Sequence, residues 1–239
     1  MTTGPRVDWP LWPLPLLAGL LPALASLLAW ALSTQAALVP ACNPFIDGCV
    51  SISRAARHEL PNHLFRALVL PAATLQALTW LAAAQVLLQM GGEAVRRSAL
   101  VLALIGVVAG IALVIYGSFL GTEGTVYRAL RRNGTTLYFG GTCLAMLLLA
   151  RALRRLHAKG RLALPRRHEH GLTALLGAMV LLGIGNAMVG WWADAQTQDR
   201  IENVTEWWGS LALTLAFVTL ASLWRRLGVR LQLELRPHT

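Results

Sequence analysis

Charged side chains are scarce in this chain. Only 13% of its 239 residues are Asp, Glu, Lys or Arg, whereas 56% are hydrophobic, and the mean hydropathy is +0.55. A soluble domain of this length ordinarily carries about twice that share of charge. The composition therefore excludes an ordinary soluble protein, and the length leaves no room for a large soluble domain as well. We expect a single integral membrane domain over residues 1–239.

Ionisable residues are nearly absent from six long apolar stretches. These stretches cover residues 13–34, 64–90, 98–120, 135–153, 171–192 and 206–225. An uncharged run of about 18 residues or more is long enough to cross a bilayer as an α-helix. The predicted fold is an all-α, polytopic membrane protein, a six-transmembrane-helix bundle. The lack of charge inside the spans argues against a pump or a proton-coupled transporter.

Lysine is almost absent too, so arginine supplies nearly all of the positive charge. With the N-terminus in the cytoplasm, 14 of the 21 Lys and Arg residues fall on the inside and 7 on the outside. The excess of inside charge predicts an N-in/C-in orientation. The arginine-rich, nearly lysine-free composition is typical of a bacterial inner-membrane protein. The net charge of +10 is explained by these flanks, so we expect no nucleic acid partner. "HEH" at 168–170 is expected to be a solvated cytoplasmic anchor.

Cysteine is limited to three residues, two of which lie in the predicted exoplasmic loop 35–63. There, Cys42 and Cys49 face an oxidising space and are candidates for a disulfide, although two independent thiols would also fit. Cys143 falls in the fourth span and is expected to pack as a small residue.

Several chemical signatures are also missing. There is no G-x-S-x-G motif, and the spans contain no histidine. His58 and His63 are five residues apart with Pro61 between them, which is not the spacing of a helical zinc pair. We therefore expect no metal site and no cofactor.

What is present is a polar outer surface formed by the exoplasmic loops. The candidate residues for a pocket or a lipid headgroup site are Asp47, Ser51, Ser53, His58, His63, Arg66, Arg131, Arg132, Glu202 and Glu206. The outer arginines run against the positive-inside rule, so they either bind lipid phosphates or pair with the outer carboxylates. Ser51 and Ser53 would equally serve as turn or helix caps.

The loop itself is expected to fold down onto the bundle. Asn62 is a plausible N-cap for the second span, which would place Arg66 one turn into the helix. A cation at that depth needs a partner, and Glu206, Glu202 and Asp47 are on the same side.

Polar side chains within the spans predict contacts between helices. Gln76, Gln85 and Asn186 are expected to form interhelical hydrogen bonds. "GVVAG" at 106–110 is a small-xxx-small pattern, which indicates close packing within the bundle rather than a dimer seam.

Three motifs resemble those of a known superfamily. "SIS" is followed by a polar run and then "PNHLFR", so the matching residues are Ser51, Ile52, Ser53, Pro61, Asn62, Phe65 and Arg66. "RRNGTTLYFGGTCLAMLLLARAL" and "IENVTEWWGSLAL" are weaker similarities. The chain resembles the superfamily of the post-GPI-attachment lipid-remodelling factor, the FGF-receptor-activating protein-like group, and the damage-regulated autophagy modulators (DRAM). It departs from it by having Arg131 and Arg132 where the family often has a histidine.

The resemblance implies a six-helix membrane protein concerned with lipids or membrane homeostasis. A bacterial member would not act on GPI anchors. The leading hypothesis is a non-catalytic protein that interacts with membrane lipids. The first alternative is an outer-leaflet lipid acyl-modifying enzyme, with His58 or His63 as the base, Arg66, Arg131 and Arg132 on the phosphate, and Glu206 orienting the site. The second alternative is an accessory subunit with a membrane-protein partner.

Overall fold

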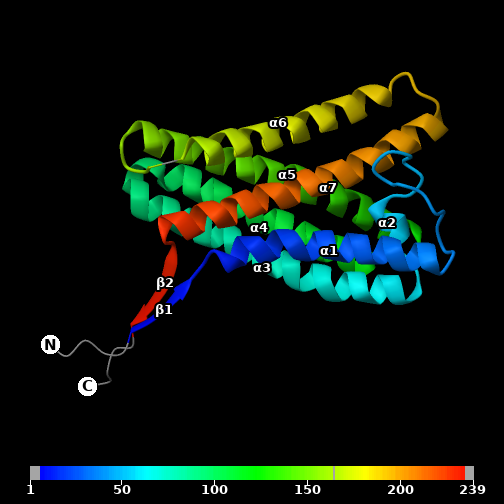
Figure 1. Cartoon of the computed structure of the whole chain (residues 1–239), viewed down its shortest axis with the longest axis horizontal. Coiled ribbons are helices and arrows are strands. Elements are labelled where there is room, and N and C mark those ends of the chain that lie inside the picture. The colour runs from blue at the N-terminus through cyan, green and yellow to red at the C-terminus, as the bar shows by residue number, and fades with distance from the viewer. Residues whose placement is uncertain (1–5, 164, 235–239) are drawn as a thin grey trace.

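Helices form nearly all of the regular structure. The computed structural model describes residues 6–163 and 165–234. In this part of the chain there are six long helices: α1 (Pro13–Gln35), α3 (Glu59–Gly91), α4 (Arg96–Phe119), α5 (Thr125–Ala158), α6 (Arg166–Val189) and α7 (Ala195–Leu227) (Figure 1). The short α2 (Ile52–Ala55) precedes α3, and the 3₁₀ turn η1 (Gly92–Val95) joins α3 to α4. The expected all-α class is confirmed.

The long helices are apolar enough to cross a membrane. Within the described residues, five continuous helical stretches meet the length and hydropathy of a membrane span. One of them, Glu59–Phe119, contains α3, η1 and α4, and these two helices pack along each other. The chain is thus a helical integral membrane protein.

The helices are arranged as an incomplete ring. Neighbours around it are α5, α4, α3, α1, α7 and α6, and each adjacent pair packs extensively. The packing between α6 and α5, which would close the ring, is much weaker, and α5 barely contacts α7. We call this weak junction of α5 with α6 and α7 the seam.

Small residues bring the helices together opposite the seam. A Cβ on Gly106 of α4 would lie 2.1 Å from Cγ of Trp80, and one on Gly110 would lie 3.2 Å from the Ala73 carbonyl oxygen. Trp80 also packs against Phe217 of α7, with 5.6 Å between ring centroids. The "GVVAG" motif therefore serves close packing within the bundle, as predicted.

The polar residues of the spans behave differently from one another. Gln76 is fully buried, and its Nε2 donates to the Ala18 carbonyl oxygen at 3.1 Å and to the Tyr138 hydroxyl at 3.2 Å. This link between α3, α1 and α5 confirms the expectation for Gln76. Gln85 is exposed and makes no such bond in the described structure, while Oδ1 of Asn186 is buried without a partner there.

Five of the long helices begin earlier than the predicted spans: α3, α4, α5, α6 and α7. α3 starts at Glu59 rather than at residue 64, because Pro61 lies in its first turn, where no backbone N–H is needed. The prediction that Asn62 caps this helix is wrong. Its side chain instead donates to the carbonyl oxygens of Ala56 and Leu120, at 2.9 and 3.1 Å. α7 starts at Ala195, well before residue 206.

A small antiparallel ribbon pairs the two ends of the chain. β1 (Arg6–Pro10) aligns with β2 (Arg230–Glu234), and Arg230 forms an ion pair with Asp8 at 2.9 Å. The ribbon extends from the bundle at the end opposite to the loop that carries α2 (Figure 1). It was not expected from the sequence, and it places the start of α1 and the end of α7 together.

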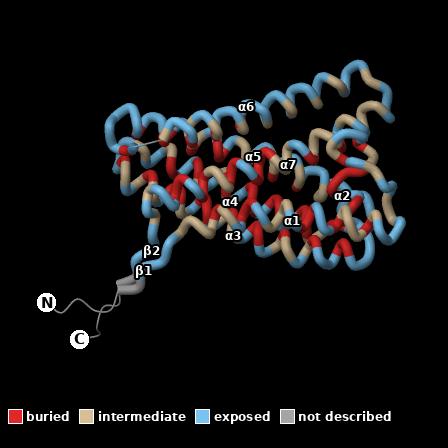
Figure 2. Tube along the Cα trace, in the orientation of Figure 1, coloured by how far each residue is buried: buried red, intermediate tan, exposed pale blue. Residues whose placement is uncertain are grey.

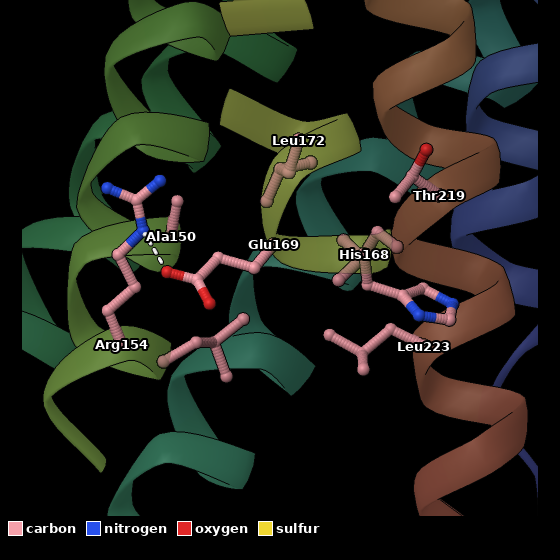
Figure 3. A pocket seen from close by; sticks show the side chains of 9 residues that line it. Ala150, Arg154, His168, Glu169, Leu172, Thr219 and Leu223 are labelled. Atoms are coloured by element: carbon pink, nitrogen blue, oxygen red, sulfur yellow. Dashed lines mark ion pairs between the residues drawn. The ribbon is translucent and has the colours of Figure 1, made fainter. Parts of the chain in front are cut away.

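α6 is held firmly only at its first turns. Arg154 Nε of α5 lies 3.2 Å from Glu169 Oε1 (Figure 3). His168 Nε2 lies 3.1 Å from Ser222 Oγ of α7. Its buried residues, His168, Leu172 and Leu176, all lie in its first half, and the rest of the helix is exposed or half-buried (Figure 2). The expectation that residues 168–170 are a solvated anchor is wrong for His168, which is only 6% exposed.

Candidate functional site

The long loop before α2 lies over one end of the bundle. Cys42 and Cys49, for which a disulfide and two independent thiols were both open, form a disulfide within it. Tryptophans of α7 hold the loop from below: Trp207 Nε1 donates to the Val50 carbonyl oxygen at 2.9 Å, and Trp208 Nε1 donates to that of Phe45 at 3.0 Å. The prediction that this loop folds onto the bundle is confirmed.

Gly48 is the point of closest approach between the loop and α7. Its φ is +61°, and a Cβ there would lie 2.2 Å from the Arg200 carbonyl oxygen. Asn203 Nδ2 donates to the Gly48 carbonyl oxygen at 2.8 Å. Only glycine fits such a backbone conformation and spacing, so the loop is seated in one position on α7.

α2 directs its N-terminus toward α7. Ser51 is its N-cap and accepts a hydrogen bond from the Arg54 backbone N–H at 3.1 Å, which confirms the capping alternative for this serine. The carboxylate of Glu206 faces the backbone N–H groups of Ile52 and Ser53. The hydroxyl of Ser53 lies 3.1 Å from that of Tyr116 on α4. α2 thus links the loop to two helices.

A cleft of about 790 Å³ occupies the seam beneath this loop. Its walls are α5 on one side, α6 and α7 on the other, and α2 at the loop end. The lining residues are Ser51, Ser53, Arg54, Arg132, Thr135, Thr136, Phe139, Gly140, Cys143, Leu144, Leu147, Met179, Leu182, Gly183, Asn186, Asp199, Glu202, Asn203, Thr205, Glu206 and Gly209. The volume lies within the range of small-molecule sites, roughly 300–1,000 Å³.

The cleft is polar at one end and apolar along its length. On α5 the lining runs from Arg132 to Leu147, which corresponds to about 22 Å of helix at 1.5 Å per residue. The first turns present Arg132 and two threonines, and the later turns present aromatic and aliphatic side chains. The apolar part therefore follows the bundle axis away from the loop.

The polar end carries charges of both signs. Two guanidinium groups, those of Arg54 and Arg132, meet three carboxylates, those of Asp199, Glu202 and Glu206. Arg54 and Asp199 form an ion pair. Glu202 accepts a hydrogen bond from Gln198 Nε2 at 2.9 Å. Such a surface can contact a phosphate and an ammonium group at once.

One polar atom in the apolar part has no partner. Asn186 of α6 lines the cleft, and its Oδ1 is buried without a hydrogen bond in the described structure. A buried acceptor without a partner costs free energy, so a donor from a ligand in the cleft would stabilise it.

The structure brings together half of the predicted site residues. Ser51, Ser53, Arg132, Glu202 and Glu206 line the cleft. Five others do not. His58 and Arg131 line a separate hollow, His63 is exposed on α3 and lines neither space, and Asp47 accepts a hydrogen bond from the Asn43 backbone N–H at 2.8 Å, within the loop.

Arg66 is the fifth residue outside the cleft. It is half-buried on α3 and forms no ion pair or hydrogen bond with the side chains or loop carbonyls in the described residues. The predicted pairing with Glu206, Glu202 or Asp47 is wrong, because Glu206 turns toward α2 instead and Asp47 is used within the loop.

Sequence reasoning missed Asp199 and Asn203, which share one helical face with the predicted Glu202 and Glu206. The four residues are spaced at i, i+3, i+4 and i+7 on α7, which is the spacing of one helix face. The pattern was readable in the sequence, but it falls in a segment interpreted as a loop. On α5, positions 132, 136, 139, 143 and 147 follow the same period.

No metal centre accompanies the cleft. Among the described residues, there is no group of three or more His, Cys, Asp or Glu side chains placed to hold a metal ion.

Comparison with known proteins adds no relative. No family model, curated protein or solved structure matches the chain. The resemblance to the DRAM and lipid-remodelling superfamily, with its histidine replaced by Arg131 and Arg132, remains a prediction from short motifs.

Proposed function

We propose that the protein binds a single phospholipid in the seam, as a non-catalytic lipid-interacting protein of a bacterial inner membrane. The amphipathic cleft between α5 and α6 carries the proposal, because it joins a charged end to an apolar channel of lipid-like proportions. The headgroup lies under the loop beside α2, and an acyl chain lies along α5.

The topology that accompanies this proposal has six crossings, with both termini in the cytoplasm. The pairing of β1 with β2 supports termini on one side of the membrane. The distribution of arginines places that side inside. The polar end of the cleft then lies at the outer surface, and the apolar part of the α5 lining, from Phe139 to Leu147, is about 12 Å long, which fits within the outer half of a hydrocarbon core about 30 Å thick.

The charges of the polar end favour a zwitterionic headgroup, such as that of an ethanolamine phospholipid. Arg132 has no ion pair in the described structure and is available for the phosphate, and Glu202 and Glu206 can accept from the ammonium group. An anionic headgroup would meet three carboxylates and only two guanidinium groups, which is unfavourable.

The packing of α6 gives the lipid a way in. The Arg154–Glu169 and His168–Ser222 contacts hold the helix at the end opposite to the loop. Toward the loop, α6 has no fully buried residue and leaves the cleft open at the side. A lipid can therefore enter from the bilayer without passing through water.

The lining also favours binding over chemistry. It contains no histidine, and both histidines considered as a catalytic base lie elsewhere. The acyl-modifying alternative would need another base among the three carboxylates of the lining, and of these Glu206 already faces the backbone N–H groups of α2. Lipid analysis of a deletion strain separates the alternatives, because an enzyme would alter the acyl-chain profile and a binding protein would not.

A matched pair of glycine substitutions tests the cleft. Gly140 lines it and Gly177 does not, and a Cβ at either position would meet nothing within 4 Å. We expect native mass spectrometry of the detergent-purified protein to show one phospholipid bound to the wild type and to Gly177→Leu. Gly140→Leu should lose most of it, because the added side chain occupies the channel. Arg132→Gln should weaken retention, with Arg66→Gln as the charge-matched control.

Two results would contradict the proposal. Equal retention by Gly140→Leu and Gly177→Leu would place the lipid on the general surface. If the wild-type protein is purified from membranes with no phospholipid bound, the cleft does not retain this ligand and the proposal is wrong.

A second candidate, an accessory subunit, is favoured by the bare surface of α6. Gly171, Gly177, Gly183 and Gly185 all leave open space where a Cβ would stand. Small residues allow close approach of another transmembrane helix. Cross-linking in native membranes from cysteines placed on α6 distinguishes the two, because a subunit gives one discrete heterologous adduct and a lipid-binding protein gives none.

A further inference from the structure

A second hollow opens at the loop end of the bundle, on the other side of the start of α5. Its volume is about 570 Å³, and it lies between the α2–α3 junction and the turn from α4 to α5. The lining residues are Arg57, His58, Gly121, Thr122, Glu123, Gly124, Arg128 and Arg131. Apart from two glycines, these residues have polar or charged side chains. The hollow therefore suits a water-soluble group and not a lipid tail.

Three guanidinium groups meet in this hollow. Arg57 and Arg128 are close enough to Arg131 to repel its charge. Arg131 is held in place by donating from Nη1 to the carbonyl oxygens of Phe119, at 3.1 Å, and of Thr122. Within the described residues neither Arg57 nor Arg128 forms an ion pair, and neither does Glu123. Glu123 is the only carboxylate of the lining, so positive charge remains in excess.

The start of α5 adds to this positive charge. Its N-cap is Gly124, with φ of +121° and no capping side chain, so the first backbone N–H groups have no side-chain acceptor. A helix N-terminus carries a partial positive charge that disfavours nearby cations. Arg128 and Arg131 nevertheless lie in the first two turns. Repulsion among the arginines and repulsion from the helix end would both be relieved by a bound anion.

We propose that this hollow binds a phosphate-bearing anion, held by Arg57, Arg128 and Arg131 at the N-terminus of α5. Guanidinium groups bind phosphate oxygens through paired N–H donors, and three of them around one space favour a group with several oxygens. The phosphate belongs either to a soluble ligand or to the headgroup of an anionic lipid beside α5. This site is separate from the cleft, whose polar end carries both signs of charge.

The soluble source is tested by isothermal titration calorimetry of detergent-purified protein with inorganic pyrophosphate. We expect saturable binding that weakens as salt rises. The Arg57→Gln/Arg128→Gln variant should bind at least about tenfold more weakly, because it removes two of the three guanidinium groups that would hold the anion. Arg66→Gln, on α3 but outside the hollow, should bind as the wild type does. Glu123→Gln should bind more tightly, because it removes the opposing carboxylate.

The lipid source is tested in nanodiscs without soluble phosphate. An anionic phosphatidylglycerol bilayer should raise the unfolding temperature relative to a phosphatidylcholine bilayer, and the double arginine variant should lose that rise. A response in either experiment supports the site if it is lost in the double variant and kept in Arg66→Gln. The experiment that gives the response identifies the source of the phosphate. Absence of both responses overturns the proposal. The proposal is also overturned if Arg66→Gln weakens pyrophosphate binding as much as the double variant does. The same holds if citrate, used as a second anion, binds as tightly as pyrophosphate. Either result would mean that the protein attracts anions only through its general positive charge.

Discussion

The side of the bundle built from α1, α3 and α4 and the seam beside α6 use the same residue type in opposite ways. On α4, Gly106 and Gly110 admit Trp80 and the backbone of α3 into direct contact. On α6, Gly177 and Gly185 have nothing near the place where a Cβ would stand. One set of glycines closes the bundle, and the other leaves a helix bare.

Under the proposed function, this difference explains where a lipid can enter. Membrane helices gain little from burying apolar surface against each other, so close packing and hydrogen bonds decide which pairs associate. The α1, α3 and α4 side has both, through Gly106 and Gln76. In the described structure, the second half of α6 has neither a buried residue nor a hydrogen bond to α5 or α7. Under the proposed function, a lipid would occupy this side.

The largest effect should come from Gly106→Ala on the closed side, compared with the same substitution at Gly177 on the open side. Gly106→Ala would place a Cβ about 2.1 Å from Trp80, which has no room to shift because it is fully buried against Phe217. We expect destabilisation by about 3 kcal/mol or more, at the upper end for an overpacked core, because the overlap is severe. Gly177→Ala should be neutral or slightly stabilising, since alanine is the better helix former. Thermal unfolding in detergent measures both, and equal shifts would mean that the two sides are packed alike.

The next effect concerns the loop that covers the end of the seam. Replacing Cys42 and Cys49 together by serine should destabilise the protein by about 2–3 kcal/mol, because the disulfide closes a loop of seven residues in sequence separation and restricts the unfolded chain. A reducing agent should lower the unfolding temperature of the wild type to that of the double serine variant. It should leave the unfolding temperature of the variant unchanged. If reductant affects both proteins alike, the loop is stabilised by its tryptophan contacts and not by the disulfide.

The spans could be predicted from the sequence because each apolar run must form its backbone hydrogen bonds internally in a bilayer. The residues at which the helices start could not be predicted in this way. The segment before Glu206 is polar, and its helix is stabilised by the Asp194 cap and by contacts with the loop, such as that between Asn203 and Gly48. These contacts join residues about 150 positions apart in the chain, so no local pattern reveals them.

The candidate site was predictable only in its side chains and not in its arrangement. Ser51, Arg132 and Glu206 can be recognised in the sequence because they are polar residues at an apolar boundary. For Arg66 the sequence indicates partners only by their side of the membrane, and the structure forms none of the predicted pairs with Glu206, Glu202 or Asp47. The cleft itself results from weak packing between α5 and α6, and a missing contact leaves no signal in the residues that fail to make it.

A smaller effect should follow from removing the buried hydrogen bonds of Gln76. Gln76→Leu loses the donors to Ala18 and Tyr138, which lie on the neighbouring helices α1 and α5. Such bonds contribute about 0.6 kcal/mol on average in membrane proteins and at most about 1.7. Gln85→Leu is the matched control, because Gln85 is on the same helix but exposed. A loss of stability in Gln85→Leu equal to that in Gln76→Leu would show that the bonds do not hold this side together.

The smallest effect should appear at the turn from α6 to α7, on the open side. Asp194 is exposed and caps α7, with Oδ1 accepting from the backbone N–H groups of Gln196 and Thr197, both at 3.0 Å. The Thr197 N–H, together with the Thr197 hydroxyl, holds the pKa of this carboxyl below its usual 3.8. A depressed folded-state pKa means that the stabilisation is fully present above the unfolded value and is lost as pH falls through the folded value.

Hydrogen exchange of the peptide that contains Gln196 and Thr197 measures this cap directly. At about pH 6, the wild type and Asp194→Asn should protect these amides alike, because asparagine is also a good N-cap, while Asp194→Ala should not protect them. At about pH 2, the wild type should lose protection relative to Asp194→Asn at the same pH, since only the carboxyl titrates. Amides of α4 should keep their protection in all three proteins. Fraying that spread into α4 would mean that the open side and the closed side unfold as one unit, and the contrast between them would then be one of shape and not of local stability.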